Sequence, residues 1–201
     1  MMSVLAGVPV KSFAAAKNRL AAALPPGARI ALSQEMAMRT CVLLKRASAR
    51  PLIMAADPTV ADWANDLGLE VSLENGSDLN EAAGATVALA SGQPWIVIHA
   101  DLPLLDSEIL TCLIPAIAAG HSVIGPSRDG GTPVIGGNMS SFEFRYGPSS
   151  YQRHLRLLAL TDPTVVVDAR LAIDLDDPSD LEAVRGRVPW IADILDSLAN
   201  P

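Results

Sequence analysis

The sequence predicts an α/β fold, a three-layer α/β/α sandwich around a mixed, mainly parallel sheet. Short apolar runs with strand-like composition alternate along the 201 residues with longer segments of helical periodicity. Several runs, above all Trp95 to Ala100, are continuously apolar, which is typical of strands covered by helices on both faces. At this length we expect one domain, residues 1–201, with a full hydrophobic core.

Proline and aspartate signals mark where several of the expected helices begin and end. Pro25-Pro26 stops a first Ala-rich helix. Asp57-Pro58 and Asp177-Pro178 each start a helix, because aspartate caps the backbone and proline suits the first helical position. Asp106 is the cap of the helix that follows it. The expected helices are Ala14 to Leu24, Ala28 to Ala47, one after Asp57, Leu79 to Ala90, Ser107 to Ala119, Ser149 to Leu160, one after Asp177, and Pro189 to Leu198.

The strands alternate with these helices, so most of the sheet is expected to be parallel. Ligands of such sheets bind outside the carboxyl ends of the strands. The segment Gly136 to Gly147 is expected to be irregular. The expected strands are Val4 to Val10, Pro51 to Ala56, Glu70 to Leu73, Trp95 to Ala100, Ser122 to Gly125, Pro133 to Gly136, Val165 to Val167 and Leu171 to Leu175.

Composition excludes several classes of partner and location. The formal net charge of −7 argues against nucleic acid, and no apolar run is long enough to cross a membrane. The start of the chain lacks a signal-peptide pattern, so we expect a cytoplasmic protein. Cys41 and Cys112 are far apart in apolar segments and are expected to be buried thiols. No Lys or Arg lies between Pro51 and Ser127, so an anionic ligand must meet the segments on either side.

Three carboxylates are candidates for one cation site. Asp101 follows the strongest strand, and Asp174 and Asp176 alternate with apolar residues, which puts both on one face of a strand. Carboxylate oxygens suit a hard divalent cation. For Asp101 alone, a turn or cap role is equally compatible with the sequence, although Asp106 is the better cap. Asp180 is expected to be structural, in the first turn of its helix.

Three cations near the amino terminus are candidates for binding a polyphosphate. Lys11, Lys17 and Arg19 lie on a loop and the first turns of the helix that follows the first expected strand. The segment is neither a Walker A loop nor a dinucleotide-binding turn, because the glycines are missing. A solvated helix face is the alternative interpretation.

Two further segments are candidate anion sites. The glycine-rich turn Arg128 to Thr132 lets the backbone approach a ligand while Thr132 offers a hydroxyl, and an ordinary hairpin turn is the alternative. The other segment places a glycine and two serines at an expected helix start, with a histidine on the same face; plain N-capping is its alternative. Its candidate residues are Gly147, Ser149, Ser150 and His154. His99 and His121 are expected to be structural.

With these motifs in hand, the chain is similar to the CofC/FbiD family, the 2-phospho-L-lactate or phosphoenolpyruvate guanylyltransferases of coenzyme F-420 biosynthesis. The resemblance covers nearly the whole chain, and it rests on the order and spacing of short motifs. These are Val8-Pro9-Val10-Lys11, Ala16-Lys17-Asn18-Arg19-Leu20, Leu79-Asn80, Ala100-Asp101-Leu102-Pro103, Gly130-Gly131-Thr132, Tyr146-Gly147-Pro148-Ser149-Ser150 with His154, and Asp174-Leu175-Asp176 with Asp180-Leu181.

The resemblance implies a nucleotide-diphospho-sugar transferase (GT-A-like) fold and a site of two parts. Magnesium, or manganese in its place, is held by the residues matching Asp101, Asp174 and Asp176. Thr132, Gly147 and Ser150 hold the phosphate and carboxylate of the acceptor acid. The other substrate-binding candidates are Asn80, Ser149 and His154.

The expected reaction is attack by an acceptor phosphate oxygen on the α-phosphorus of GTP, with release of pyrophosphate. Lys11, Lys17 and Arg19 would offset the charge of the leaving group beside the metal on Asp101. The acceptor, whether phosphoenolpyruvate, 2-phospho-L-lactate or 3-phosphoglycerate, stays open, as do the base and a homodimer. The alternatives are another nucleotide or acceptor, such as a phosphonate or sugar phosphate, a GT-A glycosyltransferase, and a silent nucleotide-binding subunit.

Overall fold

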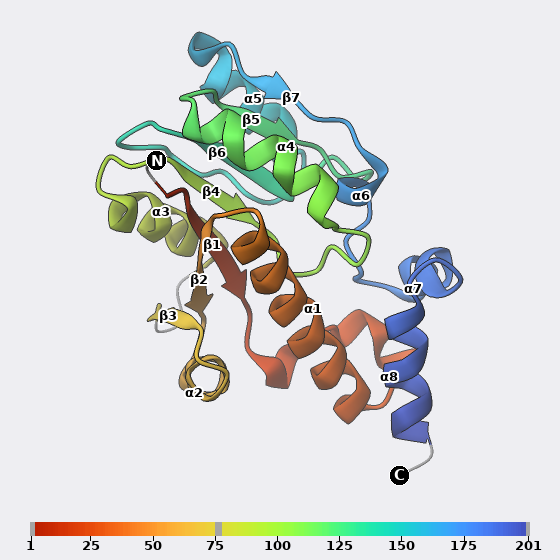
Figure 1. Ribbon diagram of the computed structural model, residues 1–201. Coiled ribbons are helices and arrows are strands. Elements are labelled where there is room, and N and C mark those ends of the chain that lie inside the picture. The colour runs from red at the N-terminus through yellow and green to blue at the C-terminus, as the bar shows by residue number, and fades with distance from the viewer. Residues whose placement is uncertain (1–2, 75–77, 200–201) are drawn as a thin grey trace.

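A seven-stranded sheet forms the middle layer of the protein, in the order β3-β2-β1-β4-β6-β5-β7 (Figure 1). The computed structural model describes residues 3–74 and 78–199. β6 runs antiparallel to β4 and β5, and the other paired strands are parallel. The mixed, mainly parallel sheet is therefore confirmed. The strands are β1 (Leu5–Val10), β2 (Arg50–Ala55), β3 (Glu70–Leu73), β4 (Trp95–Ile98), β5 (Val123–Gly125), β6 (Val134–Gly137) and β7 (Thr164–Val165).

Helices cover the sheet and extend beyond one of its edges (Figure 1). Asp57, Asp106 and Asp177 each cap the following helix through a side-chain oxygen, as the sequence predicts. Within the described ranges, no helix is both long and apolar enough to span a bilayer. The helices are α1 (Pro26–Arg46), α2 (Pro58–Asp66), α3 (Leu79–Ala90), α4 (Ser107–Ala118), α5 (Ser150–Leu158), α6 (Ala169–Ala172), α7 (Pro178–Arg185), α8 (Pro189–Ala199) and the 3-10 turns η1 (Phe13–Ala15), η2 (Asn18–Ala22) and η3 (Ala159–Thr161).

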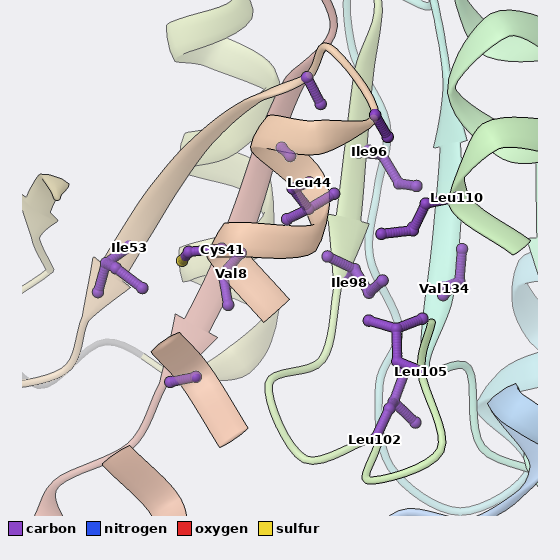
Figure 2. Packing of buried hydrophobic residues seen from close by; sticks show 14 of the residues in the cluster. Val8, Cys41, Leu44, Ile53, Ile96, Ile98, Leu102, Leu105, Leu110 and Val134 are labelled. Carbon is purple, nitrogen blue, oxygen red and sulfur yellow. The ribbon is translucent and has the colours of Figure 1, made fainter. Parts of the chain in front are cut away.

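The alternation of side chains along the strands builds one apolar layer on each face of the sheet. Ile96 and Ile98 of β4 pack with α1, α2 and α4, whereas Trp95 and Val97 pack with α3 and α5. Figure 2 shows the first of these layers, in which Leu102, from the loop after β4, lies among the strand and helix side chains. Burial of Leu102 fixes the loop at the residue directly after Asp101, so this part of the core positions the site.

A third apolar cluster lies beyond the sheet, between the amino-terminal half of α1 and the helices α7 and α8. Leu20 of η2 and Leu175, which precedes α7, are both fully buried in it. Leu20 belongs to the segment that carries the basic candidates, and Leu175 lies between the acidic candidates Asp174 and Asp176. The cluster therefore holds segments more than 150 residues apart in the chain against each other.

The helix predicted over Ala14 to Leu24 is wrong. The chain forms two short 3-10 turns, η1 and η2, separated by Lys17, whose φ of 49° lies in the left-handed region. An α-helix cannot pass through that conformation. The carbonyl of Ala16 accepts a hydrogen bond from the side chain of Arg29, whereas in a helix it would accept one from a backbone N–H. The local preference of the alanine-rich sequence is overridden by contacts that Lys17 makes elsewhere.

The strand predicted over Leu171 to Leu175 is also wrong. Residues 169–172 form the short helix α6, and the following segment is extended at Ile173 without pairing in the sheet. Its alternation is nevertheless present, because Leu175 is buried while Asp174 and Asp176 are half-buried. The N–H of Leu175 donates to the carbonyl of Asp101 at 2.9 Å. This bond brings the acidic segment to the end of β4 without making it a strand of the sheet.

Gly136 of β6 gives a stability prediction. A Cβ at this position would lie 2.8 Å from the carbonyl oxygen of Trp95 and 3.2 Å from the Cα of Ile96, both backbone atoms of β4. Gly136→Ala is expected to lower the free energy of unfolding by about 1–3 kcal/mol, because the paired strand cannot move aside. In the control Gly84→Ala, inside α3 with open space around it, stability should rise by about 0.5–1 kcal/mol. Urea unfolding checks both, and a Gly136→Ala protein as stable as the parent would contradict the packing.

Candidate active site

A cleft of about 280 Å³ opens at the carboxyl ends of β1 and β4. This is the edge at which parallel sheets bind ligands. Five of the residues that the sequence singles out line the cleft, three basic and two acidic. They are Lys11, Lys17, Arg19, Asp101 and Asp176.

Lys17 joins the two acidic residues of the cleft. Its Nζ lies 2.8 Å from Asp101 Oδ2 and 2.8 Å from Asp176 Oδ1, and its side chain is only 10% exposed. Burial opposes the charge of both partners, but their mutual attraction wins: the pKa of Lys17 is raised, and that of Asp101 is lowered to about 2. The left-handed backbone of Lys17 is thus held in place by two charge-assisted hydrogen bonds.

The third predicted carboxylate, Asp174, lies close enough to the other two to feel their charge. Its pKa is raised to about 6, first by burial and next by repulsion from Asp101, with Asp129 and Asp176 adding to it. Among residues 3–74 and 78–199, no group of three or more His, Cys, Asp or Glu side chains is arranged to hold a metal ion. The structure therefore brings Asp101 and Asp176 together on Lys17 and leaves Asp174 beside them.

Two observations test whether these residues fit a divalent cation. Asp101 lines the cleft, and its buried Oδ1 has no hydrogen-bond partner among the residues that the structure describes. Mg²⁺ is usually held by one or two protein carboxylates together with substrate phosphates, and does not require a complete protein cage. Asp101 and Asp176 meet that requirement, and the point between them already accepts a positive charge, the ammonium of Lys17.

Asp180 holds the backbone of the acidic segment. Its Oδ2 accepts the N–H groups of Asp176 and Asp177 at 2.9 Å each, and its Oδ1 pairs with Arg128. The N–H of Arg128 in turn donates to the carbonyl of Ala172. Asp180 is structural, as predicted, but through more than its position in the first turn of α7. It fixes the residue that carries the Asp176 carboxylate.

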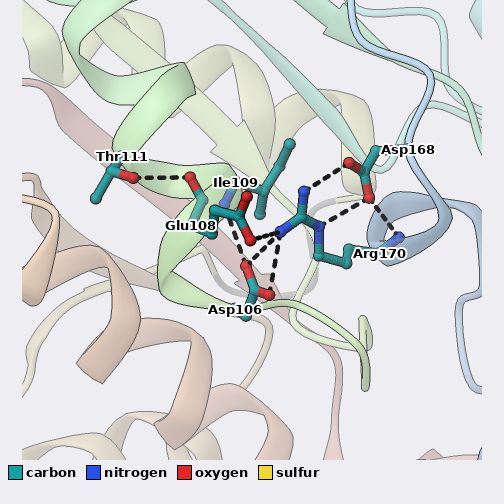
Figure 3. Close-up of polar contacts among 6 residues, drawn as sticks. All are labelled: Asp106, Glu108, Ile109, Thr111, Asp168 and Arg170. Carbon is teal, nitrogen blue, oxygen red and sulfur yellow. Dashed lines mark hydrogen bonds and ion pairs between the residues drawn. The ribbon is translucent and has the colours of Figure 1, made fainter.

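A partly exposed network of salt bridges anchors α6, the helix that leads into the acidic segment (Figure 3). Arg170 of α6 pairs with Asp168 at 2.8 Å, with Asp106 at 3.0 Å and with Glu108 at 3.1 Å. The first partner precedes α6, and the other two lie at the start of α4. Because the network is partly exposed, each pair contributes little to stability on its own. Its role is to fix α6 against α4.

The second group of predicted residues forms a buried hydrogen-bond chain. Thr132 Oγ1 lies 3.1 Å from Ser150 Oγ and 3.0 Å from His154 Nδ1. The other ring nitrogen, Nε2, accepts the backbone N–H of Arg145 at 2.7 Å. His154 is fully buried and both of its nitrogens are engaged by the protein. That it reaches the same ligand as Ser150 stays a prediction, and in this structure both ring nitrogens already have protein partners.

The loop before α5 surrounds this chain. Gly147 has a φ of 108°, a conformation that favours glycine. Asn80 accepts the N–H of Tyr146 at 2.6 Å, so in this structure its amide oxygen braces the loop. Ser149 is exposed in a left-handed conformation, and its side chain makes no cap hydrogen bond. Ser150 begins the helix and is 2% exposed.

The cleft and the hydroxyl chain are separate but adjacent. Of the residues that the structure describes, those lining the cleft include neither Thr132 nor Ser150. His99 lines the cleft, and its ring centroid lies 5.3 Å from that of Tyr146. The ring centroids of Tyr146 and His154 lie 4.9 Å apart. The sequence assigned His99 only a structural role, because a histidine inside an apolar strand gives no sign of a nearby cleft.

The burial of His154 predicts a pH dependence of stability. Burial lowers the pKa of His154 from its ordinary 6.5 to about 4. Between these two values the unfolded chain binds the proton and the folded protein does not, so stability falls as the pH falls from 6.5 to 4. The loss is on the order of 3 kcal/mol. Urea unfolding at pH 7 and pH 4.5 should show a smaller drop in a His154→Gln protein than in the parent. Equal drops in both proteins would contradict this environment for His154.

The structure thus places acidic side chains beside a basic loop at the carboxyl edge of a mixed α/β sheet. A solved structure shares this fold. A structure described as a nucleotide-diphospho-sugar transferase of Desulfovibrio desulfuricans G20 superposes with a TM-score of 0.78 at 20% identity, over 93% of this chain and 87% of that one. This likeness confirms the predicted fold.

Comparison with known sequences identifies the family of this chain. Residues 2–185 match the family described as "Guanylyl transferase CofC like", so the chain belongs to this family. It is 34% identical to a phosphoenolpyruvate guanylyltransferase of Rubrobacter xylanophilus, over 90% of this chain and 92% of that protein. It is 31% identical to a 2-phospho-L-lactate guanylyltransferase of Methanothermobacter thermautotrophicus, over 77% of this chain and 70% of that protein. The resemblance found in the sequence motifs is confirmed.

Proposed function

We propose that this protein transfers GMP from GTP to the phosphate of a small phosphorylated carboxylic acid and releases pyrophosphate, as a step of coenzyme F-420 biosynthesis. The observation that carries the proposal is the cleft in which Lys17 joins Asp101 and Asp176, in a chain of the CofC-like family. The named relatives act on phosphoenolpyruvate or 2-phospho-L-lactate, and both acids are acceptors under the proposal.

The basic residues of the cleft bind the triphosphate. Lys11, Lys17 and Arg19 all face the same space, so together they offset the charge of the GTP phosphates and of the leaving pyrophosphate. An acceptor phosphate oxygen forms the new bond to the α-phosphorus while the bond to the β-phosphate oxygen breaks. A phosphate monoester is already ionised, so this step needs no general base. The protein contributes by positioning and by electrostatic stabilisation.

Magnesium, or manganese in its place, is the proposed cofactor. Asp101 and Asp176 would hold it, with Asp174 as the third carboxylate beside them. When bound, such an ion supplies positive charge next to the reacting phosphate. The buried, unpartnered oxygen of Asp101 supports this assignment.

Thr132, Gly147 and Ser150 are the proposed site of the acceptor acid. Thr132 and Ser150 supply hydroxyls, and a side chain at Gly147 would strain the backbone. Asn80 and Ser149 lie on the elements around them. The ring of Tyr146 contacts both His99, at the cleft, and His154, and so connects the Thr132–Ser150 pair to the cleft.

A product assay tests the proposal. The protein is incubated with magnesium, each of the four NTPs in turn and a panel of phosphorylated three-carbon acids, and nucleotide-linked products are identified by mass. The expected result is a GMP adduct of one of these acids, formed with pyrophosphate and abolished by a chelator. Release of a nucleoside diphosphate instead would indicate a glycosyltransferase. Absence of any adduct and of pyrophosphate with all combinations would overturn the proposal.

A further inference from the structure

The hydrogen bonds that link Arg145, His154, Thr132 and Ser150 have a donor-to-acceptor direction that a backbone N–H imposes. A backbone N–H is always a donor, so His154 Nε2, which lies 2.7 Å from the N–H of Arg145, must be the acceptor. In a neutral imidazole the single proton then sits on the other nitrogen, Nδ1. Burial lowers the pKa of this ring, which keeps it neutral near pH 7. His154 therefore donates its Nδ1–H to Thr132 Oγ1.

One of the two hydroxyl hydrogens of Thr132 and Ser150 has no acceptor among the described residues. Thr132 and Ser150 carry one hydroxyl hydrogen each, and only one of these can lie in the 3.1 Å contact between the two oxygens. In the part of the chain that the structure describes, neither hydroxyl has another hydrogen-bond partner. Whichever oxygen donates to the other, the chain ends in a free O–H. This O–H can therefore donate to an oxygen atom of a ligand.

We propose that His154 is a positioning residue that turns the Thr132–Ser150 pair into a hydrogen-bond donor for an anionic oxygen of the acceptor acid. This inference rests on the proposed function and deepens it. The acceptor is recognised here as an anion, through the one O–H of the pair that the described residues leave without an acceptor before the ligand arrives. Preorganisation of this kind strengthens binding because no proton has to be rearranged.

The tautomer of His154 is the first test. The ¹⁵N resonances of the imidazole nitrogens at pH 7 distinguish a proton on Nδ1 from one on Nε2. The expected result is a neutral ring protonated on Nδ1, in the protein without any ligand. A ring protonated on Nε2, or on both nitrogens, would overturn the inference whatever the activity of the protein.

Binding of the acceptor is the second test. Calorimetry measures the affinity for phosphoenolpyruvate, 2-phospho-L-lactate and 3-phosphoglycerate, with magnesium and α,β-methylene-GTP present, since this analogue cannot release pyrophosphate. Thr132→Val should weaken binding of the preferred acid by at least about tenfold, the scale of a hydrogen bond to a charged group. Thr132→Ser keeps the hydroxyl and should stay within about threefold of the parent.

A matched control and a separate outcome complete the test. Thr111→Val makes the same substitution on the exposed side of α4, where the hydroxyl donates to the carbonyl of Glu108 (Figure 3), and should leave acceptor affinity unchanged. Thr132→Val binding as tightly as Thr111→Val, or no acid binding to the parent, would overturn the inference. An acid that binds as expected but receives no GMP from GTP would overturn the proposed function alone.

Discussion

Asp101→Asn is expected to slow GMP transfer by about 30- to 1000-fold, a loss of ~2–4 kcal/mol of transition-state stabilisation. The amide keeps the shape of the side chain but removes its charge. Asp101 is one of the two carboxylates on Lys17, and its second oxygen is buried without a hydrogen-bond partner in residues 3–74 and 78–199. Loss of the charge therefore weakens the proposed cation site and frees Lys17 from one of its two anchors. Steady-state kcat/KM for the preferred acid measures the effect.

Asp106→Asn is the matched control for this substitution. Asp106 also follows β4, but it caps α4 and pairs with Arg170 outside the cleft. Asparagine caps helices as well as aspartate does. The rate of this variant should therefore stay close to that of the parent. Rates for Asp101→Asn close to those of Asp106→Asn would contradict the assignment of Asp101 to the reaction.

Lys17→Met is expected to change catalysis and metal binding in opposite directions. Transfer should slow by at least about tenfold, because the cleft loses a positive charge next to the phosphates. Binding of magnesium in the absence of nucleotide should tighten by about tenfold or more, on the scale of charge-assisted hydrogen bonds. The reason is that the ammonium of Lys17 occupies the point between Asp101 and Asp176 that the cation would take.

Lys11→Met is the control for metal binding. Lys11 lines the same cleft, but the two carboxylates pair with Lys17 and not with it. Calorimetric titration with magnesium chloride should therefore show tighter binding for Lys17→Met than for Lys11→Met. Equal affinities, or a weaker affinity in Lys17→Met, would show that Lys17 does not compete with the cation.

Elements with a strong periodic pattern and a local stop signal could be predicted from the sequence. The continuous apolar run from Trp95 gives β4, and Asp57-Pro58 gives the start of α2. Their structure follows from side chains within a few residues, so a single sequence contains the necessary information. The same holds for Asp106 and Asp177 as caps.

Elements shaped by distant contacts could not be predicted. The alanines around Lys17 favour a helix, but Lys17 has a left-handed backbone and forms ion pairs with residues 84 and 159 positions away. The alternation around Leu175 suggested a strand, but it arises because Leu175 packs on α1, α7 and α8. A pattern of burial shows which side chains face inward, not what they face.

The candidate site was predicted in its residue types but not in its connections. Asp101, Asp176 and the three basic residues do share one cleft. The spacing of Ser150 and His154 correctly placed them on one helical face, yet the partners of His154 come from residues 132 and 145, which no local pattern reveals. Only the folded structure shows that His154 contacts the Thr132 hydroxyl and the backbone N–H of Arg145.

Locating the metal ion tests whether Asp101 and Asp176 form the cation site. A crystal of the protein with manganese and α,β-methylene-GTP would reveal the ion by its anomalous scattering. We expect a peak between the carboxylates of Asp101 and Asp176, with Lys17 displaced from them toward the phosphates. A peak elsewhere, with Lys17 still bridging both carboxylates beside a bound nucleotide, would contradict it.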